Sequence, residues 1–386
     1  MLKRKIKNLI SNRTSNVYKT LNVIEISRSR LLHNFSYIQK YNPSFSIIPV
    51  LKANAYGHGL IQGTEILNNA NCDFLAVDGY FEASKILDLT KHRILVLGYI
   101  NPDNFYLLNN KRCSYVIQDI NSLQKLASLN KPFNIHIELN TGMNRLGLSE
   151  SEIDEYLSVL KQYPRLNLEG IMTHLADADN ELDNTYTDSQ MKIFDTCVER
   201  IIGEGFSPRF FHIAQTAGSV KAKSKYANSI RLGIGLYGVN PLNPNDKEFG
   251  ELSDLKPILE FKSTIIKTIR LKSGDRVSYN GIFKAPKDMT IGVLPLGYYE
   301  GIPRELSNTG TISFNGHNLP IVGRVCMNHI MFDTKDLPVK VGDTAIIISS
   351  NIDDANSIYN ICQNNNLFNY SLMTGLSEST RRVISE

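Results

Sequence analysis

Residues 47–59 read Ile-Ile-Pro-Val-Leu-Lys-Ala-Asn-Ala-Tyr-Gly-His-Gly, an apolar run that leads into a glycine-bounded turn. The apolar part predicts a buried strand over Ile47–Lys52 that ends in a lysine. Similar short apolar or β-branched runs recur along the first part of the chain, where they alternate with amphipathic helical patterns. This alternation is typical of βα units on a parallel sheet.

Eight such strands are predicted before residue 240. They are Ile47–Lys52, Asp73–Asp78, Ile94–Tyr99, Ser114–Gln118, Asn134–Glu138, Leu168–His174, Phe210–Ala214 and Ser229–Ile234. Helical patterns such as Glu150–Tyr163 and Ser189–Gly205 lie between them. Eight βα units predict an α/β fold of the (β/α)8 barrel type, whose active site lies at the C-terminal ends of the strands. An open doubly wound sheet is the alternative, but its usual G-x-G-x-x-G fingerprint is absent after the first strand.

From Pro257 onward the sequence becomes rich in strand patterns. The predicted strands are Leu259–Ile269, Thr290–Leu296, Thr311–Phe314, Leu319–Val325 and Thr344–Ser349, with one helical pattern near Asp354–Asn364. Asn315-Gly316 is a strong hairpin signal between two of these strands. We therefore predict three parts: a basic arm (1–22), a barrel domain (23–250) and a mainly β C-terminal domain (251–386), with Asn240–Lys256 as the linker. Val23–Ile26 is a candidate extra strand of the second domain.

The composition is that of an ordinary globular protein. The 386 residues are 42% hydrophobic and 21% charged, which excludes a mainly disordered chain. The 42 basic and 38 acidic side chains give a formal net charge of +4. Because residues 1–22 hold six basic residues and no acidic one, the rest of the chain carries −2. A faintly acidic body argues against nucleic acid as a partner.

The sequence also limits the expected compartment. No apolar run reaches the roughly 18 residues that a membrane span needs, so no membrane is expected as a partner. Residues 1–30 contain no apolar h-region of a secretory signal. The five cysteines form no CxxC pair or zinc spacing, which predicts no metal and a reducing, cytoplasmic compartment. The basic residues 1–22 fit an untargeted arm or, as the alternative, an organelle transit peptide.

Polar residues near the predicted strand ends are the candidates for chemistry, because these ends form the barrel mouth. Lys52 ends the first strand, and burial there would lower the pKa of its ammonium group, as a Schiff-base or general-base lysine requires. Arg145 lies on a glycine-bounded loop after Glu138 and suits the capture of a carboxylate. His174 follows the sixth strand.

The seventh and eighth strands end in small residues. Thr216-Ala217-Gly218 opens a helix, and Gly233-Ile234-Gly235 follows Arg231. Glycines permit close approach of a ligand, and barrels often bind phosphate at these two loops. Each candidate could also have no role in chemistry: Lys52 as a surface lysine, Arg145 as a solvated arginine and His174 as a structural histidine. Together, however, a lysine on the first strand and a phosphate cradle on the last two predict a pyridoxal-phosphate pocket.

Six segments, in order along the chain, resemble those of the fold-type III alanine racemase family. They are Lys52–Gly59, Thr141–Gly147, Arg231–Gly238, Val277–Gly281, Gly297–Gly301 and Gly323–Met327, and the resemblance extends from about Asn22 to Arg382. It implies a barrel that binds pyridoxal 5′-phosphate (PLP), a mainly β second domain, and a homodimer whose subunits share their active sites. It also implies a small amino acid as substrate and production of D-alanine for bacterial peptidoglycan.

The resemblance assigns roles to individual residues. Lys52 would carry the cofactor and act as one catalytic base, and Tyr279 from the other subunit would act as the opposing base. His174 and Arg231 match the pair that tunes this tyrosine, and Arg231 also faces the pyridine nitrogen. The positions that contact the cofactor phosphate are Tyr56, Thr216, Gly233, Ile234 and Tyr370. Arg145 would hold the cofactor phenolate and help bind the substrate carboxylate, with Tyr298 and Met327 lining the entrance.

The chain departs from the family pattern near the substrate. Glu138 stands where many members have a carbamylated lysine, and we interpret it as a support for Arg145 that needs no CO2. Asn140 and Asn328 replace acidic residues, and Glu300-Gly301 replaces an Asp-Gly pair. These changes leave open a racemase of serine or of a broader set of amino acids. A non-catalytic PLP-binding protein or a decarboxylase are further alternatives, although neither needs the segment with Tyr279.

Overall fold

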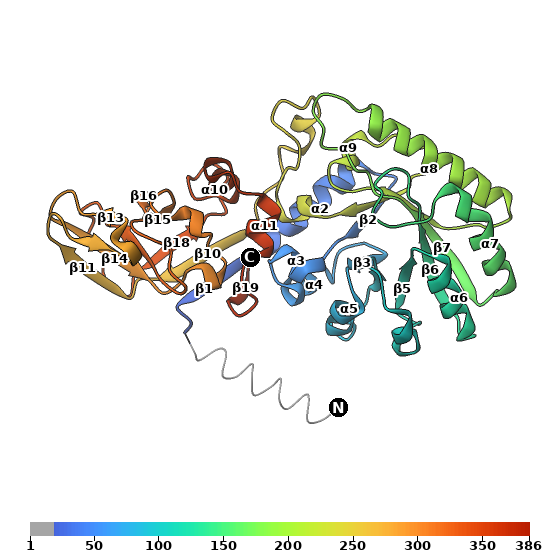
Figure 1. The fold of residues 1–386 in the computed structure, drawn as a ribbon, viewed down its shortest axis with the longest axis horizontal. Coiled ribbons are helices and arrows are strands. Elements are labelled where there is room, and N and C mark those ends of the chain that lie inside the picture. The colour runs from blue at the N-terminus through green and yellow to red at the C-terminus, as the bar shows by residue number, and fades with distance from the viewer. Residues whose placement is uncertain (1–18) are drawn as a thin grey trace. The chain divides into compact units, whose positions relative to one another are not determined.

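The structure, a computed structural model, describes residues 19–386. Residues 1–18, which hold most of the predicted basic arm, lie outside the described residues. The described chain divides into two compact units (Figure 1). One contains Ser27–Ile258, and the other contains residues 19–26 together with Leu259–Ser385.

A sheet of eight parallel strands forms the centre of the first unit. The strands are β2 (Ser46–Pro49), β3 (Phe74–Val77), β4 (Arg93–Val96), β5 (Cys113–Ile117), β6 (Phe133–Glu138), β7 (Leu166–Met172), β8 (Phe210–Ala214) and β9 (Ser229–Leu232). Their hydrogen-bonded order is β2-β9-β8-β7-β6-β5-β4-β3, and a bridge between Val50 and Ala76 brings the two end strands together. The predicted (β/α)8 barrel is confirmed.

Helices follow most of the strands, as the alternating sequence pattern predicts. The α-helices of this unit are α2 (Arg28–Tyr41), α3 (Lys52–Tyr56), α4 (Leu60–Leu67), α5 (Tyr80–Ile86), α6 (Ile120–Ser128), α7 (Ile153–Gln162), α8 (Thr185–Gly203) and α9 (Gly218–Lys221). Short 3-10 turns are η1 (Pro102–Leu107), η2 (Glu150–Glu152), η3 (Ile234–Tyr237) and η4 (Phe249–Leu252). Asp119 caps α6 by accepting a hydrogen bond from the Ser122 amide at 2.8 Å.

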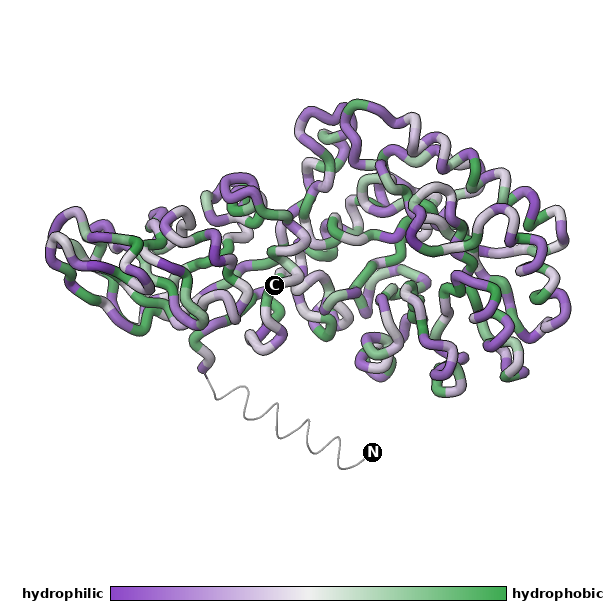
Figure 2. The backbone as a smooth tube through the Cα atoms, in the orientation of Figure 1, coloured by the Kyte–Doolittle hydropathy of each residue, from purple (hydrophilic) through white to green (hydrophobic). Residues whose placement is uncertain are grey.

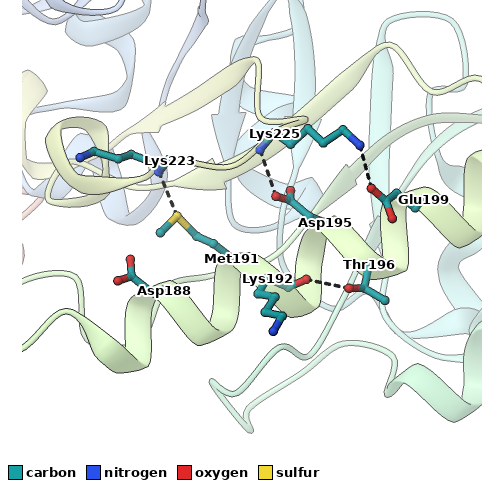
Figure 3. Close-up of a pocket in the computed structure, with 8 residues that line it drawn as sticks. All are labelled: Asp188, Met191, Lys192, Asp195, Thr196, Glu199, Lys223 and Lys225. Atoms are coloured by element: carbon teal, nitrogen blue, oxygen red, sulfur yellow. Dashed lines mark hydrogen bonds and ion pairs between the residues drawn. The ribbon is translucent and has the colours of Figure 1, made fainter.

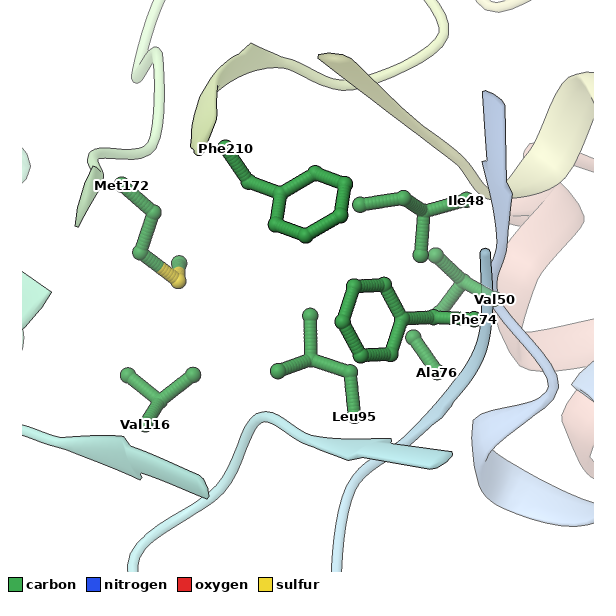
Figure 4. Close-up of a cluster of buried hydrophobic side chains, with 8 residues drawn as sticks. All are labelled: Ile48, Val50, Phe74, Ala76, Leu95, Val116, Met172 and Phe210. Atoms are coloured by element: carbon green, nitrogen blue, oxygen red, sulfur yellow. The ribbon is translucent and has the colours of Figure 1, made fainter. Parts of the chain in front are cut away.

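Apolar side chains from the strands fill much of the barrel interior. The buried cluster consists of Ile48, Val50, Phe74, Ala76, Leu95, Val116, Met172 and Phe210, which converge from opposite strands (Figure 4). The rings of Phe74 and Phe210 meet edge-on with centroids 5.0 Å apart, a favourable geometry for aromatic pairs. Hydrophobic residues run along the strands in Figure 2, as expected of parallel strands that are covered on both faces.

The first strand is shorter than the sequence predicts. β2 ends at Pro49, Val50 makes a single bridge, and Lys52 begins the turn α3 instead of ending a strand. Val50 and Leu51, which lie between the end of β2 and this turn, are both buried, so hydrophobicity alone could not show where the strand stops.

Antiparallel sheets make up the second unit. One sheet has the order β16-β15-β18-β10-β1-β19, another has the order β11-β14-β17, and β12 pairs with β13. The strands are β1 (Asn22–Ser27), β10 (Leu259–Thr264), β11 (Lys267–Leu271), β12 (Arg276–Val277), β13 (Phe283–Lys284), β14 (Met289–Leu294), β15 (Thr311–Phe314), β16 (His317–Pro320), β17 (Ile330–Asp333), β18 (Thr344–Ile348) and β19 (Arg381–Ser385). The helical elements are α10 (Ile358–Asn365), α11 (Asn369–Thr374), η5 (Tyr279–Gly281), η6 (Tyr298–Glu300) and η7 (Arg304–Leu306).

Two local predictions in this unit are confirmed. Asn315 and Gly316 have φ angles of 49° and 78° and connect the antiparallel pair β15 and β16, as a two-residue hairpin turn requires. Val23–Ile26 lies in β1, which pairs antiparallel with β10 from Asn22 against Ser263 to Ile26 against Leu259. The predicted strand Leu319–Val325 is instead the shorter β16, because the chain leaves the sheet after Pro320.

Candidate active site

A left-handed turn places Lys52 at the mouth of the barrel. The φ angles of the four residues 53–56 lie between 52° and 54°, and Gly57 and Gly59 continue with positive values. Left-handed backbone costs an L-residue roughly 1–2 kcal/mol, so four in succession are a local strain that the surroundings must offset. The Asn54 side chain helps by accepting a hydrogen bond from the Leu60 amide at 2.8 Å. Such strain in a barrel loop at the C-terminal strand ends indicates a functional site.

Lys52 itself is accessible from solvent. Its Nζ lies 3.6 Å from Oδ1 of Asp78, which follows β3, and 40% of its side chain is exposed. The lysine is therefore less buried than a strand-end position predicts. Its amine can meet a ligand at the barrel mouth.

The loops after β8 and β9 form a cradle of small residues. Thr216 Oγ1 accepts a hydrogen bond from the Gly235 amide at 3.1 Å. A Cβ atom at Gly235 would lie 2.5 Å from Thr216 Cγ2, and one at Gly233 would lie 2.9 Å from Tyr56 Oη. A larger residue at either position would displace Thr216 or the Tyr56 hydroxyl, so the two glycines let the backbone, Tyr56 and Thr216 approach a ligand closely. This cradle fits a phosphate group.

Arg231 lies beside this cradle and is only 4% exposed. Its Nη2 donates to the Thr173 carbonyl oxygen at 2.7 Å and to His174 Nδ1 at 3.2 Å. Its Nη1 donates to His212 Nδ1 at 3.0 Å and to the His212 carbonyl oxygen. Burial lowers the pKa of the guanidinium to about 10, so Arg231 remains a cation near neutral pH.

His174 is a neutral imidazole in this setting. Burial, followed by the charges of Arg231, Arg145 and Lys52, lowers the pKa of His174 to about 3. A guanidinium only donates hydrogen bonds, so Nδ1 of His174 accepts and its proton resides on Nε2. His174 therefore presents one N–H donor on the side away from Arg231.

Glu138 is a buried carboxylate at the end of β6. It is 6% exposed, and burial raises its pKa, whereas Arg231, a Gln118 hydrogen bond, Arg145 and Lys52 oppose that rise. Within residues 19–386, no ion pair joins Glu138 to Arg145, and Arg231 is the strongest opposing charge. The structure thus places Glu138 among the cations of the mouth.

The loop that carries Arg145 is held by an amide side chain. Asn140 Oδ1 accepts hydrogen bonds from the backbone amides of Gly142 at 3.2 Å and Asn144 at 2.9 Å. Gly147 closes the loop with a φ of 99°, where a Cβ atom would lie 2.9 Å from the Asn140 amide nitrogen. Asn140 therefore has a structural role that an uncharged side chain performs well, and Arg145 is left exposed.

The other site residues predicted from the sequence lie in the second unit. Tyr279 is 69% exposed on η5, directly after Ser278, whose φ of 65° is unusual for a residue with a side chain. Ser278 Oγ donates to the Arg324 carbonyl oxygen at 3.1 Å, which fixes this strained backbone. Exposed Tyr298, on η6, and exposed Met327 lie on two segments joined by a hydrogen bond from the Tyr299 amide to the Met327 carbonyl oxygen at 3.0 Å, and Tyr370 lies on α11. A hollow of about 500 Å3 adjoins Tyr279.

Asn328 and Glu300 are linked in the same unit. Asn328 Nδ2 donates to Glu300 Oε1 at 2.8 Å, and Glu300 Oε2 accepts from the Gly297 amide at 2.7 Å. The amide of Asn328 can donate a hydrogen bond to the Glu300 carboxylate, which an ionised acidic side chain at position 328 could not do. Both departures from the family pattern form one hydrogen-bonded pair.

A separate groove of about 380 Å3 lies against the outer face of α8 and contains none of these residues (Figure 3). Two of its acidic side chains are paired within the groove: Lys225 Nζ donates to Glu199 at 2.9 Å, and the Lys225 amide donates to Asp195 at 3.0 Å. Because the groove contains none of the predicted site residues, we assign it no role in catalysis.

Sequence reasoning missed three groups inside the barrel, of which His212 contacts Arg231 directly and the other two follow behind it. His212, His136 and Glu169 continue from Arg231 through the interior. The one available signal was a polar side chain within an apolar strand pattern, such as His136 between Ile135 and Ile137. In the described part of the chain there is no cluster of three potential metal ligands, and all five cysteines are free. No helix among residues 19–386 is long and apolar enough to cross a membrane.

The buried histidines predict a loss of stability in mild acid. Burial lowers the pKa values of His136, His174 and His212 below the ordinary histidine value of about 6.5. Below about pH 6.5 the unfolded chain binds protons that the folded chain does not, so stability falls by up to about 1.4 kcal/mol per pH unit for each histidine that stays neutral. Glu138, whose pKa is raised, acts in the opposite direction but is one group against three.

We expect urea unfolding at pH 7, 6 and 5 to show a steep decrease in the free energy of unfolding over this range. Replacing exposed His317 by glutamine should leave the slope unchanged, because this residue lies on the hairpin of the β16 strand. Equal stability at pH 7 and pH 5 would contradict the assignment of three neutral imidazoles.

The chain matches two family models along nearly its whole length. Residues 26–241 match "Alanine racemase, N-terminal domain", and residues 258–384 match "Alanine racemase, C-terminal domain". The alanine racemase of Francisella tularensis subsp. novicida (strain U112) is 32% identical over 371 residues, which cover 94% of this chain and 100% of that protein.

Solved structures show the same fold. Alanine racemase from Clostridium difficile 630 superposes with a TM-score of 0.87 at 25% identity, covering 95% of this chain and 96% of that one. Alanine racemase from Bartonella henselae, solved with covalently bound pyridoxal phosphate, superposes with a TM-score of 0.81 at 23% identity and covers 95% of this chain and all of that one.

Proposed function

This chain belongs to the alanine racemase family and is an amino-acid racemase, and from that premise we propose that it interconverts L-alanine and D-alanine with PLP as its cofactor. In this proposal the protein is a cytoplasmic homodimer, and each subunit has two domains, the barrel and the mainly β part. Its product, D-alanine, is used for peptidoglycan. The observation that carries the proposal is the mouth of the barrel, where an accessible Lys52 and the glycine cradle occur together.

The residues present fit PLP. Lys52 provides an amine for the aldehyde, Tyr56, Thr216, Gly233, Ile234 and Tyr370 would hold the phosphate, and Arg231 would face the ring nitrogen. PLP, when bound, supplies an electron sink that weakens the bond between substrate Cα and its hydrogen. Arg231 stays cationic near neutral pH and so would keep the ring nitrogen of PLP unprotonated. An unprotonated ring nitrogen makes PLP a weaker electron sink.

Racemisation requires an acid/base group on each face of Cα. Lys52 Nζ would move the proton on one face, and the Tyr279 hydroxyl of a second copy of the chain would move it on the other. Tyr279 suits delivery to another subunit because it is exposed on a backbone segment with a fixed, unusual conformation. Arg145 would bind the substrate carboxylate, and Tyr298 with Met327 would border its entrance.

An α-proton exchange assay in D2O tests this function. The holoenzyme is incubated with each of several amino acids, and deuterium incorporation and chirality are measured afterwards. Exchange with loss of chirality for alanine is the expected result. If the α-proton of serine exchanges faster than that of alanine, serine is the substrate. If many amino acids exchange at equal rates, the enzyme is a broad-range racemase. PLP binding without exchange would identify a non-catalytic PLP-binding protein.

Glu138 provides a test of the charge balance at the mouth. We expect Glu138→Gln to weaken alanine binding and turnover, because it removes a buried negative charge among Arg231, Arg145 and Lys52. A lost charge-assisted contact is worth roughly 1.5–3 kcal/mol, or about 10- to 150-fold in kcat/KM. The measurement is steady-state kinetics with and without added bicarbonate.

The wild-type enzyme and Glu138→Asp provide the controls. Since glutamate carries its charge without carbamylation, bicarbonate should change neither of them. If Glu138→Gln has the same kcat and KM as the wild type, Glu138 has no supporting role.

A further inference from the structure

A line of polar side chains crosses the otherwise apolar interior of the barrel. It starts at Arg231 near the C-terminal end of β9 and continues through His212 on β8 and His136 on β6 to Glu169 on β7. Both histidines are fully buried, and 10% of the Glu169 side chain is exposed. Buried polar groups cost free energy unless they are paired, so a continuous line of them needs a reason.

Each member contacts the next through a defined atom. Arg231 Nη1 lies 3.0 Å from His212 Nδ1, and His212 Nε2 lies 2.7 Å from His136 Nδ1. His136 Nε2 lies 3.5 Å from Glu169 Oε2, an electrostatic contact that lacks hydrogen-bond geometry. The line therefore runs from a guanidinium at the mouth to a carboxylate deeper in the barrel.

These contacts fix where the protons are. Arg231 only donates, so His212 Nδ1 accepts and its proton lies on Nε2. His212 Nε2–H then donates to His136 Nδ1, which leaves the His136 proton on Nε2, the nitrogen nearer to Glu169, where it makes no hydrogen bond within the described chain. Both hydrogen bonds run the same way, from Arg231 to His136, and reversing either histidine tautomer would put two N–H groups against each other.

The far end of the line is anchored at the N-terminal side of the strands. Glu169 Oε2 accepts hydrogen bonds from Ser114 Oγ at 2.6 Å and from Arg93 Nη2 at 2.9 Å, and Arg93 Nη1 pairs with Oε1. Although burial opposes it, the contacts with His136, Arg93 and Ser114 lower the pKa of Glu169 to about 2. Glu169 is therefore a permanent acceptor.

The strands also leave a specific space for the His136 ring. A Cβ atom at Gly170 on β7 would lie only 2.3 Å from His136 Nδ1. The ring also stacks near Phe210 at a centroid distance of 6.0 Å and meets Phe74 edge-on at 5.7 Å. A glycine in the middle of a strand weakens it, so this glycine is explained by the imidazole beside it.

We propose that His136 and Glu169 are positioning residues for racemisation, which act through the tautomer of His212 to hold the Arg231 guanidinium in one orientation. This inference rests on the proposed function, because Arg231 is the residue assigned to the ring nitrogen of PLP. Only one side of Arg231 is held in this way. Nη1 also donates to the His212 carbonyl oxygen, and Nη2 donates to the carbonyl oxygens of Thr173 and Ile213 and to His174 Nδ1.

Imidazole nitrogen NMR of the holoenzyme labelled with 15N-histidine tests the proton arrangement directly. In the wild type, His212 and His136 should both show the neutral form protonated on Nε2. In His136→Phe, the His212 signals should change, because its Nε2–H loses its acceptor. In His136→Asn, whose Oδ1 can accept the same hydrogen bond, the His212 signals should stay close to those of the wild type. A wild-type His212 protonated on Nδ1 would overturn the proposal.

Kinetics test the consequence for Arg231. We expect His136→Phe to lower kcat by about 10- to 100-fold, with a displaced pH–rate profile and a shifted absorbance of bound PLP, since small misplacements near a reacting centre have effects of this order. The groups that face the line and define that profile are Arg231, His174, Glu138, Arg93 and Glu169. Phe74→Leu is the matched control, because it disturbs the same packing but removes no hydrogen bond.

Glu169→Gln is a second variant for the kinetic test, in case His136→Phe does not fold. It should shift the pH–rate profile in the same way, because it removes the negative charge beside His136 Nε2 and one of the two carboxylate oxygens that accept from Ser114 and Arg93. If either variant keeps the wild-type profile and loses no more kcat than Phe74→Leu, the line is structural only. Failure of the proposed function would show differently, as wild-type holoenzyme that does not exchange the alanine α-proton.

Discussion

Lys52→Ala is expected to abolish racemisation and to remove the absorbance band of covalently held PLP. Lys52 is the amine at the mouth that the left-handed turn over residues 53–56 presents to the glycine cradle. Loss of a positioned acid/base group alone lowers a rate by about 10²–10⁴-fold. Here the same residue also attaches the cofactor, so the effect on kcat should exceed that range.

The measurement combines the absorbance spectrum of the purified, PLP-treated variant with alanine α-proton exchange. Lys161→Ala is the matched control, because Lys161 is also a half-exposed barrel lysine in an ion pair, with Glu204. It should bind PLP and racemise alanine as the wild type does. A Lys52→Ala variant that kept the covalent absorbance band would show that another lysine carries PLP.

The fold could be predicted because its signals are local. Each barrel strand is a short apolar run, and the hairpin at Asn315-Gly316 depends on two residues that tolerate positive φ. Strand ends were predicted less well. Lys52 lies beyond the strand, because Val50 and Leu51 are still buried after β2 has ended and so extend the apolar run past it.

The left-handed turn itself could not be predicted. Ala53 and Ala55 favour right-handed helix, and no residue property of alanine indicates positive φ. The conformation depends on contacts with distant parts of the chain, such as the bond of the Leu51 amide to the Ala76 carbonyl oxygen at 2.7 Å. Sequence identified the lysine and its glycines but not the geometry that presents them.

The line of buried polar groups was missed for a similar reason. His136 and His212 are 76 residues apart, and each appears in the sequence as one polar residue in an apolar strand. Only the parallel register, with His136 opposite Gly170 and Met172 opposite His212, brings the two rings together. This pairing also explains the glycine at position 170, because a side chain there would collide with the His136 ring.

Tyr279→Phe is expected to keep the absorbance of bound PLP and to lower racemisation by about 10²–10⁴-fold in both directions, the usual effect of losing one positioned acid/base group. The substitution removes a single oxygen from a side chain that is 69% exposed, so the fold should not change. Tyr299→Phe is the matched control, because Tyr299 is 58% exposed in the same unit and has no assigned role.

The stereochemistry of exchange distinguishes a two-base enzyme from the alternatives. With Lys52 intact, one enantiomer of alanine should still exchange its α-proton in D2O with retained configuration, because the lysine can both remove and return the proton on its own face. The other enantiomer should not exchange, because its proton faces the missing hydroxyl. Exchange of both enantiomers with full racemisation would show that Tyr279 is not the second base. Loss of exchange for both would mean that Tyr279 also binds the substrate, since the lysine face needs no tyrosine to exchange a proton.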